Sequence, residues 1–410
     1  MRDAILAAFY GGSAALDIYF IALAPSQFVA TEVATLVYLS FLPEFSRAIA
    51  AISGANPSEL LRKRLSLVVK GTTAIAIVVA LGSVLLAPLI APRYVQEGFG
   101  RTLRMSFAAL SLLIPLIGVI GVLRAFLEAH SKFVPWAVLP AFRSGVLTIV
   151  VLLTSSTPSV GWLLLGSLLG AAAGLAYGWL SLRTLPTYDR PTIAPRLPTF
   201  PPTIAPLVAA LVVGQATLFV DNAFAARSGV GGVQAFALAS NLLVIPQAII
   251  TGAVATVYFP IFGADLAAQK RDNAVSNLVG SIRLVVWGAV PVVIIFCSPV
   301  GRAVTGLIYG RGAFDQAMVS LVSHTAAGLA LGLVPWAAFM QMRQYVLVAG
   351  EPWVVFQVAG IFLIVKWIGN SALAGSLGVP GIAIASSFAA TAACAYVALR
   401  IFARKRGRQT

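Results

Sequence analysis

Residues 221–229 read Asp221-Asn222-Ala223-Phe224-Ala225-Ala226-Arg227-Ser228-Gly229, and residues 3–11 read Asp3-Ala4-Ile5-Leu6-Ala7-Ala8-Phe9-Tyr10-Gly11. Both stretches follow the pattern Asp-x-x-x-Ala-Ala-x-x-Gly, 218 positions apart. Other short matches keep spacings between 217 and 221: Val33-Ala34-Thr35 with Val254-Ala255-Thr256, Pro43 with Pro260, Pro115 with Pro335, Pro135-Trp136 with Pro352-Trp353, and Leu182-Arg183 with Leu399-Arg400. Because this spacing holds along almost the whole chain, the sequence predicts a tandem duplication.

The composition indicates that the duplicated chain lies in a membrane. Of the 410 residues, 59% are hydrophobic and only 10% are charged, whereas a soluble domain carries about 25% charged residues. Apolar runs of about 20 residues, long enough to cross the hydrocarbon core, recur from end to end. A membrane β-barrel would show alternating segments of about ten residues instead. We therefore predict an all-α polytopic membrane protein.

Twelve apolar segments are expected. They cover residues 4–14, 17–44, 66–92, 103–127, 134–154, 160–182, 203–226, 233–262, 280–308, 318–348, 353–373 and 380–402. A Pro-rich linker, 185–202, separates an N-terminal lobe, 1–184, from a C-terminal lobe, 203–402, and a basic tail, 403–410, follows. Because six crossings return the chain to its starting side, the lobes are expected to be parallel repeats, a symmetry known in transporters. Only two residues precede Asp3, so we expect the first helix to be truncated.

The basic residues are distributed unevenly among the predicted loops. Nineteen Lys and Arg residues lie after even-numbered segments and six lie after odd-numbered ones. Since cytoplasmic loops carry the excess of Lys and Arg, both termini are predicted to be cytoplasmic. Topology and anionic lipid headgroups therefore explain most of the net charge of +15, and no nucleic-acid partner is expected.

Three basic residues are exceptions to this distribution. Arg143 and Lys366 fall within predicted segments, and Arg2 lies where a complete first helix would be deep in the membrane. A charge at the centre of a membrane helix costs roughly 2.5–3.5 kcal/mol, so it usually faces a partner or a wet cavity. We expect all three to line a cleft between the lobes and bind substrate there. The alternative is that they extend to the membrane interface or pair with acids for packing alone.

Four acids also lie in or beside apolar segments. Asp3 and Asp221 occupy equivalent repeat positions, which favours a shared structural role such as capping or pairing. Asp17 begins the second segment, where an aspartate serves as a helix N-cap. Glu32 lies inside an apolar run, seven residues after the kink expected at Pro25. A buried acid of this kind can carry a coupling proton, so Glu32, Asp221 and Asp3 are candidate coupling acids.

No catalytic or metal-binding constellation is visible in the sequence. Cys297, Cys394, His130 and His324 are isolated from one another and from acids at ligand spacing. No phosphate-binding glycine loop or nucleophile elbow is present, and Gly310-Arg311-Gly312 is too short to form one. The sequence therefore predicts no enzyme, metal or cofactor, and transport would draw on an ion gradient or on the membrane potential.

Several motifs together resemble a known family. They are Arg2-Asp3-Ala4 with Gly11 and Asp17, Phe41-Leu42-Pro43, Val220-Asp221 through Pro246, Phe259-Pro260, Tyr309-Gly310-Arg311-Gly312-Ala313-Phe314-Asp315, Asn370, and Gly378-Val379-Pro380-Gly381. Through these motifs the whole chain resembles the MviN/MurJ family of lipid II flippases. That family belongs to the multidrug/oligosaccharidyl-lipid/polysaccharide exporter superfamily.

The resemblance implies two six-helix lobes around a central cavity that opens alternately to each side of a bacterial cytoplasmic membrane. It also implies a cationic cavity that takes the diphosphate of a polyprenyl-linked sugar. Arg2 matches a cavity arginine of the family, and Asp17 matches its acidic partner. Guanidinium groups suit this role because they bind phosphate oxygens bidentately.

The sequence departs from the family pattern in three places. Where the family has an arginine pair after the proline kink, this chain has Ser26-Gln27-Phe28-Val29-Ala30. Asn241 stands at the position of a cavity arginine in the eighth helix, and the family's two further C-terminal helices do not follow the twelfth segment. Arg143 and Lys366 are candidates to replace the missing positive charge.

Three functions remain open at the level of sequence. The first is a flippase for a polyprenyl-diphosphate-linked saccharide, with lipid II as the default cargo and an exopolysaccharide or O-antigen unit as a close variant. The second is a cation-coupled small-molecule exporter, which predicts a cavity dominated by acids. The third is a non-transporting scaffold for envelope-synthesis proteins, which predicts a cleft filled by packed side chains.

Overall fold

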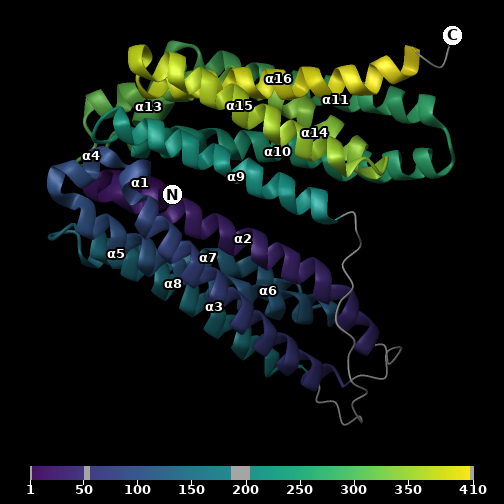
Figure 1. The fold of residues 1–410 in the computed structure, drawn as a ribbon, viewed down its shortest axis with the longest axis horizontal. Helices are drawn as coiled ribbons and strands as arrows, with labels where there is room; N and C mark the ends of the chain where they lie inside the picture. The colour runs from purple at the N-terminus through teal and green to yellow at the C-terminus, as the bar shows by residue number, and fades with distance from the viewer. Residues whose placement is uncertain (1, 50–55, 186–203, 407–410) are drawn as a thin grey trace. The chain divides into compact units, whose positions relative to one another are not determined.

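The computed structural model describes residues 2–49, 56–185 and 204–406, and these residues form helices and short connections without any strand (Figure 1). They divide into two compact units, Met1–Tyr10 with Ile18–Pro201, and Gly11–Asp17 with Pro202–Thr410. Nearly all of the predicted linker, 185–202, and the end of the predicted basic tail, 403–410, lie outside the described residues. The predicted lobe boundaries stay a prediction.

The first unit contains the N-terminal series of helices. They are α1 (Arg2–Tyr10), most of α2 (Ala14–Ile49), α3 (Pro57–Ile90), α4 (Pro92–Tyr94), the π-helical turn η1 (Val95–Phe99), α5 (Gly100–Ser111), α6 (Leu113–Ala129), α7 (Val134–Leu153) and α8 (Val160–Leu182). Within this unit α7 packs along α8, α3 packs on α5 and α6, and α1 contacts α7. The nine residues of α1 extend for about 14 Å at 1.5 Å per residue.

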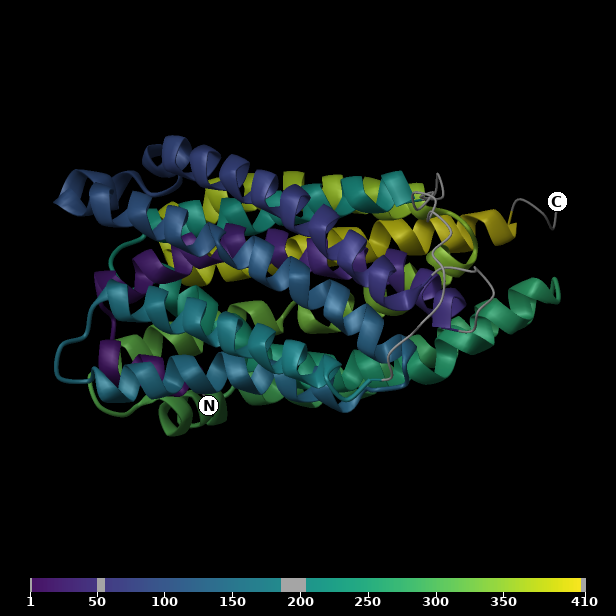
Figure 2. The same ribbon diagram turned by 90° about the horizontal axis from the view of Figure 1, so that it is seen from below.

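The second unit contains the remaining helices. They are α9 (Ile204–Arg227), α10 (Gly232–Ala267), α11 (Arg271–Phe296), α12 (Pro299–Tyr309), α13 (Gln316–Ala330), α14 (Leu333–Val348), α15 (Pro352–Leu377) and α16 (Val379–Arg406). Helix α15 packs along both α9 and α16. Figure 2 shows the helices from a second direction. The first turn of α2 also belongs to this unit, because residues Gly11–Asp17 group with the second unit.

Eight helices of the described residues are long and apolar enough to cross a membrane, and α13 and α14 together form a ninth candidate span with a 46° bend. Helices occupy all twelve predicted segments, but three of the longer segments are divided between two helices. The segment 103–127 divides at Leu112 between α5 and α6. The segment 280–308 divides between α11 and α12, because the Ser298 hydroxyl caps α12 by accepting the Val300 N–H at 3.3 Å. The segment 318–348 divides at Leu331, whose carbonyl has no N–H from Pro335 to accept.

The third helix begins earlier than the sequence predicted. The apolar run suggested a start at residue 66, whereas α3 starts at Pro57. Asn56 caps this helix, since its side-chain oxygen accepts the backbone N–H groups of Ser58 at 3.0 Å and Glu59 at 3.4 Å. The first turns of α3 are therefore charged and precede its apolar part. Hydropathy alone could not assign these charged turns to the helix.

Candidate functional site

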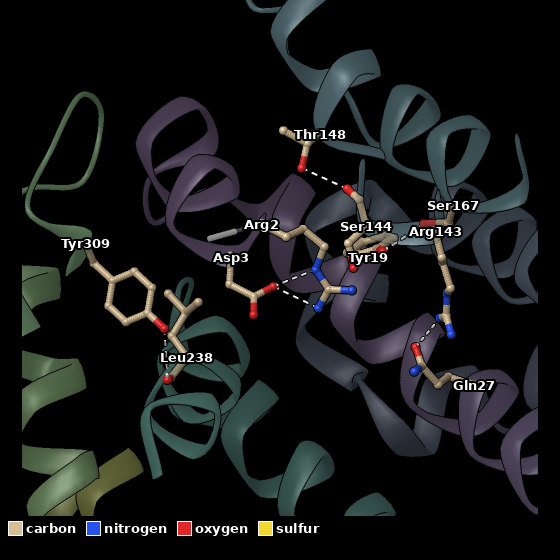
Figure 3. Close-up of polar contacts among 10 residues, drawn as sticks. All are labelled: Arg2, Asp3, Tyr19, Gln27, Arg143, Ser144, Thr148, Ser167, Leu238 and Tyr309. Atoms are coloured by element: carbon tan, nitrogen blue, oxygen red, sulfur yellow. Dashed lines mark hydrogen bonds and ion pairs between the residues drawn. The ribbon is translucent and has the colours of Figure 1, made fainter. Parts of the chain in front are cut away.

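A cluster of polar residues lies among the helices of the first unit. It comprises Arg2, Asp3, Tyr19, Gln27 and Arg143, which we call the arginine cluster (Figure 3). These residues come from α1, α2 and α7, so three helices contribute to one site.

Arg143 projects from the middle of α7 and is half-buried. Its Nη2 donates a hydrogen bond to the Oε1 atom of Gln27 on α2 (Figure 3). Helix α8 approaches the α7 backbone closely at this point, because a Cβ atom on Gly170 would lie only 2.7 Å from the Arg143 carbonyl oxygen. The close approach of α8 fixes the α7 backbone at Arg143, and the Gln27 amide holds its guanidinium.

Arg2 and Asp3 form an ion pair at the start of α1. The Nε and Nη2 atoms of Arg2 both lie 2.8 Å from Oδ1 of Asp3. The Arg2 side chain is 24% exposed and the Asp3 side chain 20% exposed. The pair is thus half-buried and partly accessible to an anion from outside.

Tyr19 is a fully buried member of the cluster on α2. Its buried hydroxyl lies 2.8 Å from the hydroxyl of Ser167 on α8. Arg2, Arg143 and Asp3 all interact electrostatically with Tyr19, and Arg2 and Arg143 repel each other. Two guanidinium groups held near each other in a membrane protein are a suitable site for a group with more than one negative charge.

The second unit contains a buried ionic site of its own. Asp221 on α9 is 1% exposed and Lys366 on α15 is 5% exposed. The Lys366 ammonium pairs with Oδ2 of Asp221, and Nδ2 of Asn370 donates to Oδ1 of Asp221 at 3.1 Å. Lys366 and Asn370 are one turn apart on α15, so both side chains reach the same face of α9. Sequence reasoning assigned Lys366 and Asp221 to separate roles, whereas the structure joins them.

Asp17 caps a helix other than its own. Its fully buried carboxylate accepts the backbone N–H of Gly231 and that of Gln234, the latter at 2.7 Å. These two N–H groups belong to the start of α10, where the helix dipole favours a negative charge. The sequence suggested that Asp17 caps the second segment, but it caps α10 instead, and its partner Gly231 is 214 residues away in the sequence.

The segment before Asp17 explains part of the motif at residues 309–315. Gly11 adopts a left-handed backbone with φ of +52°, and a Cβ atom there would lie 2.5 Å from the Ala313 carbonyl oxygen. Asp315 caps α13 by accepting the Met318 N–H at 2.8 Å. The motif at residues 309–315 can pack against residue 11 only if that residue is glycine, since a side chain would prevent so close an approach.

Two further candidate residues lie on α2 and α10. Glu32 is half-buried on α2, five residues beyond Gln27, and Asn241 is half-buried on α10 in the second unit. Sequence reasoning missed Gln27 and Tyr19 as members of the site. The signal that could have identified Gln27 is an amide within an apolar run, directly after the proline at which a kink was expected.

Membrane-length helices with ionic groups held among them are typical of a polytopic α-helical membrane transport protein. The chain belongs to the lipid II flippase MurJ family, whose model matches residues 6–409. The resemblance to the MviN/MurJ family and the predicted all-α membrane fold are therefore confirmed. No curated protein sequence shows a significant match to the chain.

Solved structures share this fold. A lipid II flippase MurJ in an inward closed conformation has a TM-score of 0.78 and 19% identity, and the match covers 98% of this chain and 84% of that one. A multidrug resistance MATE family transporter in an inward-facing conformation has a TM-score of 0.76 and 15% identity, covering 99% and 94%. A transporter of the MOP superfamily from Pyrococcus furiosus, described as having a binding pocket of reverse polarity, has a TM-score of 0.56 and 16% identity, covering 98% and 88%.

Proposed function

We propose that the protein is a flippase that moves a polyprenyl-diphosphate-linked saccharide across a bacterial cytoplasmic membrane by alternating access. The observation that carries this proposal is the match of the lipid II flippase family across residues 6–409. Lipid II is the default cargo, and an exopolysaccharide or O-antigen unit is the close variant. The topology that accompanies the proposal places both termini in the cytoplasm, as the distribution of Lys and Arg favours.

The arginine cluster is the proposed binding site for the diphosphate. Arg2 and Arg143 supply planar guanidinium groups that match phosphate oxygens. Asp3 holds Arg2 in a partly exposed pair, which a diphosphate with its larger charge can replace. Gln27 holds Arg143 through a neutral amide, so Arg143 keeps its full positive charge for the cargo.

The remaining candidate residues receive supporting roles in this proposal. Lys366 is buried against Asp221, so we assign to it the neutralisation of that carboxylate rather than contact with the cargo. Asp17 holds the start of α10, the helix that also carries Asn241. Asp221, Asp3 and Glu32 remain the candidate coupling acids, because each carboxyl group can take up a proton within the membrane region.

Complementation tests the proposal in cells. The wild-type chain is expressed in a strain whose own lipid II flippase is depleted, and we expect growth to be restored. Arg143→Gln is expected to abolish rescue, whereas Arg62→Gln, which changes an exposed arginine on α3, is expected to rescue fully. Failure of the wild-type chain, together with export of another lipid-linked glycan, would overturn lipid II as cargo and leave the flippase class standing.

A second candidate function is a cation-coupled exporter of small molecules. The similarity to an inward-facing MATE family transporter, with a TM-score of 0.76, favours this candidate. Purified protein in proteoliposomes with a proton or sodium gradient would then accumulate a small organic cation without any polyprenyl lipid. We expect no such accumulation, and its appearance would replace the flippase proposal.

A further inference from the structure

Four polar residues lie close together in the middle of α2. Thr31 and Thr35 are exposed, and Gln27 and Glu32 are half-buried. Gln27, Thr31 and Thr35 recur every four residues, so they form a row along one side of the helix. Ala30 and Ala34 are buried along one edge of this row, so the row borders the packed side of the helix. We call Gln27, Thr31, Glu32 and Thr35 the α2 row.

The α2 row presents hydrogen-bond acceptors in a fixed geometry. The Thr31 hydroxyl donates to the Gln27 carbonyl at 2.8 Å, and the Thr35 hydroxyl donates to the Thr31 carbonyl at 2.9 Å. Each hydroxyl proton is therefore committed to the helix, and each hydroxyl oxygen presents its lone pairs outward. The Glu32 carboxylate is an acceptor as well when it is ionised. A row of acceptors suits a ligand that offers many hydroxyl donors, which is the chemistry of a sugar.

The repeat-related helix has different chemistry. Thr256 on α10 is the repeat counterpart of Thr35, is also exposed, and donates to the Gly252 carbonyl at 2.9 Å. The exposed large residues of α10 before and after it are apolar, including Ile249 and Val257. Both helices thus have a threonine with this bond. Helix α10 also carries a shorter polar pair, half-buried Gln247 and Thr251, in which the Thr251 hydroxyl donates to the Gln247 carbonyl at 2.8 Å, whereas the residues directly around Thr256 are apolar.

The α2 row is continuous with the arginine cluster. Gln27 belongs to both, because its amide oxygen accepts the bond from Arg143. From Gln27 to Thr35 the helix rises about 12 Å at 1.5 Å per residue. A ligand with an anionic group at Arg143 would therefore place whatever is attached to that group along Thr31 and Thr35.

We propose that the α2 row binds the saccharide of the cargo, while Arg2 and Arg143 bind its diphosphate. The inference rests on the proposed flippase function and deepens it by giving the sugar a binding surface. On this basis the protein discriminates between lipids that share a diphosphate and differ in the sugar, and Thr31 and Thr35 determine that specificity.

Binding of two lipids to the full-length protein in nanodiscs tests the inference. One is a polyprenyl diphosphate without sugar, and the other is the same lipid carrying a disaccharide. The Thr31→Val and Thr35→Val variants keep the β-branched shape and remove the hydroxyl. We expect each to weaken binding of the sugar-bearing lipid about fivefold, and the double variant about 25-fold, because a neutral hydrogen bond contributes about 1 kcal/mol. Binding of the sugar-free lipid should not change.

Thr256→Val is the matched control, since it removes an exposed threonine with the same bond from the repeat-related helix. It should bind both lipids as the wild type does, and Arg143→Gln should weaken both. Unchanged affinity of the double variant, or an equal loss in Thr256→Val, would overturn the inference and leave the flippase proposal intact. If the wild-type protein binds neither lipid, the proposed function fails and the inference fails with it.

Discussion

The buried pair of Asp221 and Lys366 makes a quantitative prediction about stability. Lys366→Met removes the ammonium and keeps a flexible side chain of similar length. The Asp221 carboxylate then keeps only the hydrogen bond from Asn370 at 3.1 Å, in a position that is 1% exposed. Breaking a buried pair in this way costs about 3–5 kcal/mol, because one charge remains buried without compensation.

Two further variants separate this effect from general damage. Asp221→Asn combined with Lys366→Met removes both charges, so we expect the double variant to recover at least about 2 kcal/mol relative to the sum of the single losses. Lys63→Met is the matched control, since Lys63 pairs with Glu59 at 2.7 Å but the two side chains are 46% and 37% exposed. Its cost should be about 0.3–0.5 kcal/mol.

Reversible unfolding of the purified protein in mixed detergent micelles, with SDS as denaturant, measures these free energies. The order of stability should be wild type, Lys63→Met, the double variant and Lys366→Met. Equal losses for Lys366→Met and Lys63→Met would refute the reasoning, as would a double-mutant cycle with no coupling. Either result would mean that water reaches Asp221 and Lys366 in the folded protein.

Three other changes have expected outcomes in the same unfolding assay. Asp17→Ala removes the cap of α10 and should cost about 1–2 kcal/mol, a prediction that fails if Asp17→Ala matches the wild type. Gly170→Ala places a Cβ atom 2.7 Å from the α7 backbone and should lower the free energy of unfolding by about 1–3 kcal/mol. In Gly145→Ala the new Cβ atom meets nothing within 4 Å, so this variant should be more stable by up to about 1 kcal/mol. A loss of stability in both variants would exclude this steric cause. Gly11→Ala should reduce the yield of folded protein, because both its positive φ and its approach to Ala313 exclude a side chain, and a normal yield would contradict this.

Local signals in the sequence predicted the helices well. Hydropathy located the membrane segments, and the repeated Asp-x-x-x-Ala-Ala-x-x-Gly pattern related α1 to α9. The break before α12 also had a local signal, since Ser298-Pro299 is a cap followed by a proline. It was missed because the apolar run continues through it, and hydropathy is insensitive to such a cap.

The contacts of the polar residues could not be predicted in the same way. Asp17 and Gly231 are 214 positions apart, and Asp221 and Lys366 are 145 positions apart. A single sequence shows that a charge in a membrane helix needs a partner, but packing between distant helices decides which partner it meets. The sequence predicted that Asp3 and Asp221 are capped or paired. It did not identify Arg2 as the partner of Asp3 or Lys366 as the partner of Asp221.

The two repeat-related aspartates now show how one ancestral position can serve two purposes. Asp3 pairs with the adjacent Arg2 in a site that is about one-fifth exposed, and Asp221 pairs with Lys366 of another helix in a site that is almost fully buried. The Arg2–Asp3 pair is partly accessible, so on the proposed function an incoming diphosphate would displace Asp3 more easily than it would break a fully buried pair. The buried pair costs about 3–5 kcal/mol to break, so no cargo displaces Asp221 without a large opposing energy. On the proposed function, this difference in burial would leave Arg2 accessible to the cargo in the first unit and keep Asp221 and Lys366 as a packing contact in the second.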